Sequence, residues 1–208
     1  EASTGGAAVW AKVLELAKPP GTINLGQGFP DFAGSASATA GAIDALQQGQ
    51  HDQYTPVPGS ERIRAAISGL YRRLYPDIPR TPGGGSRALD VATEVCVTTS
   101  GTEALYCAVL GLVDPGDEVV FFEPFFPWYL PCIRMAGGVP KPVTLCAPDF
   151  DLLSVEAELR AAFSPRTRLC IFNTPHNPTG HCASAAELAL LPRMFQAHDV
   201  VCVADEVD

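Results

Sequence analysis

Four groups of residues in this sequence place polar, acidic or aromatic side chains directly after runs rich in Val, Ile and Phe. They are residues 99–103 (TSGTE), 123–129 (EPFFPWY), 173–180 (NTPHNPTG) and 205–207 (DEV). Each apolar run has the length and composition of a short buried strand. The chemistry of each group therefore depends on what the end of a strand can present to a ligand.

The first two groups suit a phosphate and a flat ring. In residues 99–103 a helix begins, and its free backbone amides with the hydroxyls of Ser100 and Thr102 would favour an anion. Ser and Thr are also ordinary helix caps, so this group alone does not distinguish an anion site from a capped helix start. The aromatic side chains of residues 123–129 could stack on a planar ligand or could form the rim of the core.

The other two groups suit an oxygen and a basic nitrogen. Residues 173–180 form a proline-stiffened turn that would present the amides of Asn173 and Asn177, although a plain turn is the alternative. Asp205 directly follows an apolar strand, where a carboxylate is costly without a cationic partner. A ligand with a phosphate, an aromatic ring, an oxygen substituent and a basic ring nitrogen would satisfy all four groups, and pyridoxal 5′-phosphate is such a ligand.

The elements that must position these groups alternate along the chain. We expect helices at 7–18, 35–49 and 60–75, and then strands at 91–98, 118–122, 139–145, 168–173 and 200–204 separated by helices at 101–113, 128–135, 154–163 and 184–198. A capping box at residues 184–187 (SAAE) supports the start of the last helix. This alternation predicts an α/β fold with a parallel sheet covered on both faces. Ligands of such sheets bind beyond the carboxyl ends of the strands.

Composition excludes several other classes of protein. The chain has 208 residues, 47% hydrophobic and 18% charged, which predicts a soluble globular chain rather than a disordered one. No apolar run approaches the roughly 18 residues of a membrane helix. The net charge of −9 argues against binding to nucleic acid or to an anionic membrane surface.

Cysteines, histidines and glycines suggest no further site. The seven cysteines include no C-x-x-C pair, so we expect free thiols in a reducing compartment, the cytoplasm or alternatively an organelle. His176, His181 and Cys182 lack further spaced ligands, so no metal is predicted. Residues 81–86 (TPGGGS) neither follow a strand nor end in Gly-Lys-Ser/Thr, which predicts a surface loop rather than a phosphate loop.

The sequence resembles the fold-type-I, class I/II aminotransferases that use pyridoxal phosphate. Within them it is most similar to the kynurenine aminotransferase, cysteine-conjugate β-lyase and methionine aminotransferase branch. The resemblance implies a three-layer αβα sandwich, with an N-terminal arm and the start of a small domain in residues 1–41 and an incomplete large cofactor domain in residues 42–208. It is carried by residues 24–32 (NLGQGFPDF), 53–55 (QYT), 123–126 (EPFF), 173–180 (NTPHNPTG) and 205–207 (DEV).

The resemblance also implies roles for five cofactor-binding residues. Gly101 and Thr102 would bind the phosphate, and Phe126 would stack on the pyridine ring. Asn177 would donate a hydrogen bond to the phenolic oxygen of the ring. Asp205 would pair with the pyridinium nitrogen, which keeps the ring an electron sink.

Three further residues have implied roles, two toward the substrate and one, Tyr54, as a sixth cofactor-binding residue that acts between subunits. Gly28 would approach the substrate carboxylate, and Trp10 would line the substrate pocket. Tyr54 would reach the cofactor phosphate of a partner subunit, which implies a homodimer with shared active sites.

The catalytic lysine of the family has no counterpart among Lys12, Lys18 and Lys141. In relatives this lysine holds the cofactor as a Schiff base, and we expect it beyond Asp208. Asp208 itself departs from the family, which has Tyr there. As given, the chain is therefore expected to be an inactive fragment that lacks any catalytic residue of its own.

The implied activity of the parent enzyme is transfer of an amino group from an amino acid to a 2-oxo acid. Kynurenine and large neutral or sulfur-containing amino acids are the expected donors. A C–S β-lyase on the same scaffold is one alternative, and a non-catalytic product that binds the cofactor weakly or pairs with a full-length subunit is another. A nicotinamide dinucleotide binder would need Gly-x-Gly-x-x-Gly after the first strand, which is absent.

Overall fold

The computed structural model describes residues 6–26, 28, 30–76 and 87–207, with the side chains of residues 6–9 left aside. The chain divides into two compact units, Glu1–Leu16 with Ser100–Asp208 and Ala17–Thr99. The predicted loop at 81–86, the motif positions Gln27 and Phe29, and Asp208 lie outside the described residues. The predicted domain boundary at residue 41 stays a prediction.

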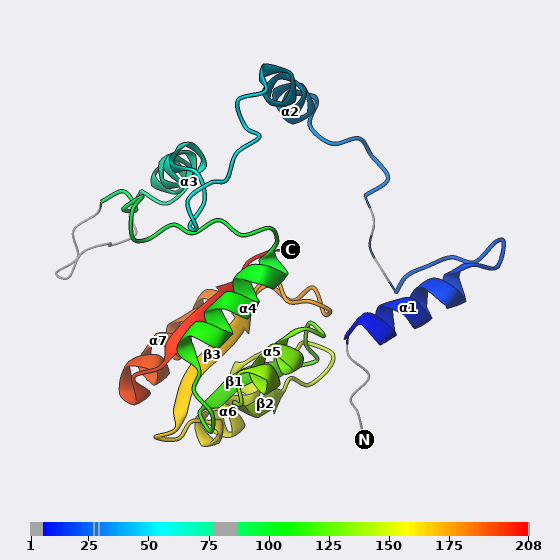
Figure 1. The fold of residues 1–208 in the computed structure, drawn as a ribbon. Coiled ribbons are helices and arrows are strands. Elements are labelled where there is room, and N and C mark those ends of the chain that lie inside the picture. Colours follow the sequence, from blue (N-terminus) through cyan, green and yellow to red (C-terminus); the bar gives the residue numbers. More distant parts are fainter. Residues whose placement is uncertain (1–5, 27, 29, 77–86, 208) are drawn as a thin grey trace. The chain divides into compact units, whose positions relative to one another are not determined.

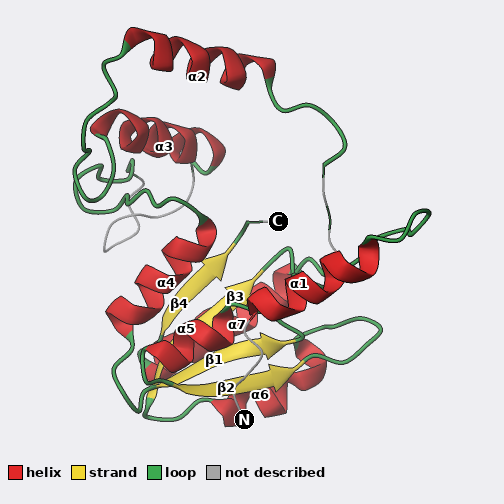
Figure 2. Ribbon diagram, turned by 45° about the vertical axis from the view of Figure 1, so that its right-hand side comes forward, coloured by secondary structure: helices red, strands yellow, loops and turns green. Residues whose placement is uncertain are grey.

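A four-stranded parallel sheet forms the centre of the first unit. Its strands are β1 (Glu118–Glu123), β2 (Val139–Thr144), β3 (Thr167–Asn173) and β4 (Val201–Asp205), in the order β2-β1-β3-β4 (Figure 2). Branched and aromatic residues dominate β1 and β3, as expected for strands buried on both faces.

Alternating side chains of β1 point to opposite faces of the sheet and into two separate apolar clusters. Val119 and Phe121 pack with helices α4 (Gly101–Leu112) and α5 (Tyr129–Met135). Val120 and Phe122 pack with α6 (Glu156–Ala162) and α7 (Ala185–His198). These two helices cover the other face of the sheet (Figure 1). The predicted α/β sandwich with a parallel sheet between two helical layers is therefore confirmed.

Local capping fixes where two of these helices begin. The Ser100 hydroxyl accepts a hydrogen bond from the backbone amide of Glu103 at the start of α4. Ser184 and Glu187 form the predicted capping box at the start of α7. The predicted helix at 154–163 is slightly shorter, because Leu153–Val155 is a 3-10 turn before α6.

The predicted strand at residues 91–98 is wrong. Residues 91–94 form a turn, in which the Asp90 carboxylate accepts hydrogen bonds from the Ala92 amide and the Thr93 hydroxyl. Residues 95–98 belong to no strand in the part of the chain that the structure describes, and Val97 donates one backbone hydrogen bond to the Pro58 carbonyl at 2.9 Å. A segment rich in β-branched residues forms a strand only where a neighbouring strand pairs with it.

The second unit contains α2 (Ala36–Gln48) and α3 (Glu61–Leu74), and α1 (Gly6–Ala17) precedes it. These match the helices expected at 35–49, 60–75 and 7–18. The Arg64 side chain of α3 is buried and donates to the carbonyls of Gly59 and Val91. Among the described residues, no helix is long and apolar enough to cross a membrane.

Candidate functional site

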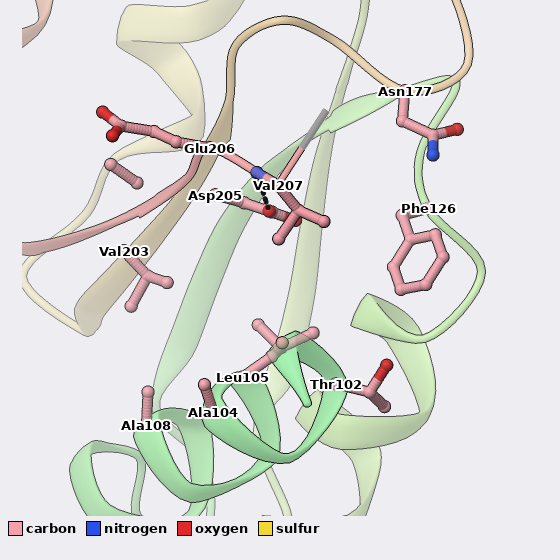
Figure 3. A pocket seen from close by; sticks show the side chains of 12 residues that line it. Thr102, Ala104, Leu105, Ala108, Phe126, Asn177, Val203, Asp205, Glu206 and Val207 are labelled. Carbon is pink, nitrogen blue, oxygen red and sulfur yellow. Dashed lines mark hydrogen bonds between the residues drawn. The ribbon is translucent and has the colours of Figure 1, made fainter. Parts of the chain in front are cut away.

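A cavity of about 400 Å³ opens at the carboxyl ends of the strands in the first unit (Figure 3). The chain leaves β1 toward β2 on one side and later returns to β3 on the other, so the loops after β1 and β3 diverge. In parallel sheets such a reversal of strand order is where ligands bind. The lining residues are Gly101, Thr102, Ala104, Leu105, Ala108, Phe126, Asn177, Val203, Ala204, Asp205, Glu206 and Val207.

The first turn of α4 forms one wall of the cavity. Gly101 and Thr102 are exposed there, at the positive end of a helix of 12 residues. A Cβ atom at position 101 would lie 3.1 Å from Cγ2 of Val207, so glycine leaves room that a side chain would fill. This wall can offer backbone amides and the Thr102 hydroxyl to an anionic group.

Phe126 and Asn177 lie together on another side of the cavity, with Asp205 facing them (Figure 3). The ring of Phe126 contacts that of Tyr129 edge-on, with centroids 5.8 Å apart and an interplanar angle of 70°. Tyr129, the first residue of α5, is 2% exposed and belongs to the core. Its contact therefore restrains the plane of the Phe126 ring. Phe126 also lines the cavity, so its ring is available to a planar ligand there.

The Asp205 carboxylate is held at both oxygens by neutral donors. The Tyr129 hydroxyl donates to Oδ2 at 2.5 Å. The Val207 amide donates to Oδ1 at 3.3 Å, the bond that is dashed in Figure 3. Neither donor has a formal charge, so a cationic group in the cavity could balance the carboxylate. Each carboxylate oxygen can accept a second hydrogen bond, which leaves Asp205 able to pair with a ring N–H.

The loop after β3 is held by side chains as well as by its prolines. The Asn177 backbone amide donates to Oδ1 of Asn173 at 2.6 Å, and Nδ2 of Asn173 donates to the Asp205 carbonyl at 2.8 Å. His176 is buried, with Nδ1 2.8 Å from the Thr179 hydroxyl. Burial lowers the pKa of His176, so this residue is a neutral part of the loop.

Glu187, a buried carboxylate that follows the loop after β3, belongs to the core and does not line the cavity. Glu187 is 2% exposed and accepts hydrogen bonds from Leu152, Ser184 and His181. Burial opposes its ionisation, but these hydrogen bonds lower the pKa of Glu187 to about 2. Within the described residues, no group of three or more His, Cys, Asp and Glu side chains could hold a metal ion.

The structure brings Gly101, Thr102, Phe126, Asn177 and Asp205, all predicted as cofactor-binding, to one cavity. Tyr54, Gly28 and Trp10 are not among its lining residues. Tyr54 and Gly28 are exposed in the second unit, and Trp10 is half-buried in α1. The described residues that line the cavity include no lysine.

Two residues outside the predicted set organise the site, namely Tyr129 and Asn173. Tyr129 lies three residues after Phe126, at the first position of α5, and its backbone amide donates to the Phe126 carbonyl at 3.1 Å across a turn that brings the two residues together. The spacing of the two aromatic residues could therefore have indicated that Tyr129 supports Phe126. The role of Asn173 depends on β3 pairing with β4, and nothing in the local sequence predicts that partner.

This set of groups fits pyridoxal phosphate. The helix start can hold its phosphate, Phe126 can face its ring, the Asn177 amide can donate to its phenolic oxygen and Asp205 can accept from its ring nitrogen. A Cβ atom at position 101 would intrude into the space beside Val207, so glycine keeps this part of the cavity open.

Comparison with known proteins gives one consistent result. The family model for aminotransferase class I and II matches residues 20–207. A probable N-succinyldiaminopimelate aminotransferase of Mycobacterium tuberculosis is 43% identical over 96% of this chain and 47% of its own length. Kynurenine–oxoglutarate transaminase 3 of rat is 35% identical over 96% of this chain and 43% of its own length.

Solved structures agree with the sequence comparisons. YbdL of Escherichia coli, described as having a methionine aminotransferase function, superposes with a TM-score of 0.85 at 36% identity, over 96% of this chain and 49% of that one. The chain thus spans about half the length of the curated relatives that it matches.

Proposed function

This chain belongs to the class I and II aminotransferases, and we propose that it supplies the cofactor-binding half of an enzyme that moves an amino group from an amino acid to a 2-oxo acid. The observation that supports this most strongly is the convergence at one cavity of the α4 N-terminus, Phe126, Asn177 and Asp205. Each comes from a different loop or strand end, and together they match the chemical groups of one cofactor.

Each residue of the proposed site has a distinct task toward pyridoxal phosphate. The amides of Gly101 and Thr102 hold the phosphate, and Phe126 holds the plane of the ring. Asn177 donates to the phenolic oxygen, and Asp205 keeps the ring nitrogen protonated. When bound, the cofactor supplies an electron sink for the pair released as the amino acid loses its α-proton. The lysine that moves this proton in relatives is proposed to lie beyond Asp208.

The amino donor is proposed to be kynurenine or a large neutral or sulfur-containing amino acid. Kynurenine and methionine appear in the names of two relatives, and a third is named for N-succinyldiaminopimelate, which belongs in the same test panel. Gly28 and Trp10 are proposed to contact the substrate. The protein is proposed to be cytoplasmic, which its seven free cysteines support, with an organelle as the alternative.

The assembly is proposed to be a homodimer with shared sites. The side chain of Tyr54 is fully exposed in the second unit and is free of the core. In the proposed dimer its hydroxyl reaches the cofactor phosphate bound by the partner subunit.

A binding titration tests the cofactor site without the lysine. The probe is 4-deoxypyridoxine 5′-phosphate, which keeps the phosphate, the phenolic oxygen and the ring nitrogen but has no aldehyde. We expect the 208-residue chain to bind it, and Asp205→Asn to weaken binding at least about tenfold, because hydrogen bonds to charged groups contribute about 1.5–3 kcal/mol. Asp199→Asn, an equal change of charge at the C-cap of α7, should leave the affinity unchanged. Equal loss in both variants, or no binding by the parent chain, would refute the site.

A second experiment tests the activity. The protein isolated from its natural source is reduced with borohydride and its intact mass is measured. A mass near twice 22.0 kDa with a reduced pyridoxyl group supports a working enzyme that extends beyond Asp208. A mass near 22.0 kDa with no adduct favours the non-catalytic alternative. With a cysteine conjugate as substrate, release of ammonia and pyruvate instead of a new amino acid would favour the C–S β-lyase.

A further inference from the structure

Asn173 is a buried residue at the last position of β3, and both the oxygen and the nitrogen of its side-chain amide make hydrogen bonds. It is 5% exposed. Oδ1 accepts the backbone amide of Asn177 at 2.6 Å, and Nδ2 donates to the carbonyl of Asp205 at 2.8 Å. One side chain therefore contacts the backbone of two residues that face the cavity from different segments.

The orientation of this amide follows from its two partners. One partner is an N–H donor and the other is a carbonyl acceptor. A flipped amide would place donor against donor and oxygen against oxygen. Of the side chains of similar size, Asn alone supplies one acceptor and one donor in this arrangement, because Asp has no donor when ionised and Leu has neither.

The contact with Asp205 is not needed for the sheet. The backbone amide of Thr174 already donates to the same carbonyl at 3.2 Å, in the line of the β3–β4 ladder. The Asn173 side chain adds a second bond to that oxygen. What it adds is a side-chain link from the end of β4 to the backbone amide of Asn177, four residues beyond Asn173.

We propose that Asn173 is a positioning residue that sets the spacing between Asn177 and Asp205. The inference rests on the proposed function. The phenolic oxygen and the ring nitrogen are joined through two adjacent carbons of a rigid ring, so the groups that bind them must be correctly spaced. Asn173 fixes that spacing through the backbone of both residues and does not touch the cofactor itself.

A matched pair of variants on the same strand tests the proposal. Asn173→Ala removes both contacts at the carboxyl end of β3. Thr167→Val, at the amino end, removes a comparable one, because the buried Thr167 hydroxyl accepts the Ser164 amide at 2.9 Å. Melting temperature, affinity for 4-deoxypyridoxine 5′-phosphate and the absorption band of the bound probe are measured for each. The band reports whether the ring nitrogen is protonated.

We expect both variants to melt earlier, and only Asn173→Ala to weaken probe binding, by about tenfold, and to shift the band toward the unprotonated ring. Asn173→Asp keeps the size and the acceptor for Asn177 but sets an anionic oxygen against the Asp205 carbonyl. It should shift the band as well, and it serves if the alanine variant does not fold.

Three results would overturn the proposal. If Asn173→Ala and Thr167→Val both melt earlier while both bind the probe within about twofold of the parent, Asn173 is only a structural residue. If Asn173→Asp folds and leaves the band and affinity unchanged, the link to Asp205 has no role. If the parent chain itself fails to bind the probe, the proposed function fails first and this inference fails with it.

Discussion

At the scale of single residues, Tyr129 joins two groups of the cavity that are far apart in sequence. Its hydroxyl donates to Asp205 and its ring supports Phe126. Tyr129→Phe removes only the hydroxyl, so we expect the Phe126 contact to persist and binding of 4-deoxypyridoxine 5′-phosphate to weaken about tenfold. Fluorescence titration measures this. Tyr106→Phe, on the exposed part of α4, is the control and should not change the affinity.

Glu187 gives a residue-scale prediction about acid stability. Its folded pKa of about 2 is below the ordinary value of 4.5, so its contribution to folding is complete above about pH 4.5 and is lost as the pH falls toward 2. Glu187→Gln should lower the free energy of unfolding at pH 7 by on the order of 3 kcal/mol. The difference from the parent chain should shrink steadily between pH 5 and pH 2.

Denaturant titrations at several pH values check this prediction. Glu156→Gln is the matched control, because Glu156 forms an exposed pair with Arg160 one helical turn away. It should cost no more than about 0.5 kcal/mol. A pH-independent loss in Glu187→Gln would show that the carboxylate charge is not what stabilises the fold.

Much of the site could be predicted from residue types alone, and the exceptions have a common cause. Asp205 and Asn177 were predicted because a buried carboxylate and a proline-stiffened amide are costly or unusual wherever they occur. Asn173 and Tyr129 lie in groups that the sequence singles out, but the contacts that they make with Asp205 could not be predicted from it. Their roles arise from the β3–β4 register and from α5 packing beneath the cavity, which are contacts between distant segments.

At the scale of elements, the capping of α7 allows a direct test of how helices are held in the fold. Ser184→Ala removes the acceptor for the Glu187 amide, and we expect a loss of about 1 kcal/mol in the free energy of unfolding. Ser35→Ala makes the same change at the start of α2, which has no buried residue. It should lower the local helix content, seen by circular dichroism, without moving the main unfolding transition. A shift of that transition by both variants would contradict the difference.

The elements themselves were predicted with uneven success. Helices such as α3 follow from the spacing of Ile63, Ile67 and Leu70, which is a local property. Strands β1 and β3 follow from continuous apolar runs. Residues 91–98 are also rich in β-branched residues, but residues 91–94 form a turn and residues 95–98 pair with no strand among the described residues. Strand prediction from composition fails where the formation of a strand depends on pairing with a distant segment.

At the scale of the whole molecule, the second unit exposes large apolar side chains. Val57 is 97% exposed and Leu25 is 92% exposed, close in sequence to the exposed Tyr54. If these side chains are covered in the proposed homodimer, Val57→Asp should convert dimer to monomer in sedimentation velocity. Gln50→Asp adds the same charge without removing apolar surface and should leave the dimer intact. A parent chain that sediments as a monomer would exclude the homodimer for this chain.

Because β1 lies between β2 and β3, its two ladders close chain loops of different length, about 20 and about 50 residues. The shorter loop closes at the lower entropic cost, so the β1–β2 pairing is expected to precede β1–β3 during folding. The cavity needs the loops after both β1 and β3, and it therefore forms late. Substitutions at Asn173 or Asp205 should accordingly raise the unfolding rate and leave the folding rate almost unchanged. The groups that define the site would then have almost no influence on how fast the chain reaches its fold.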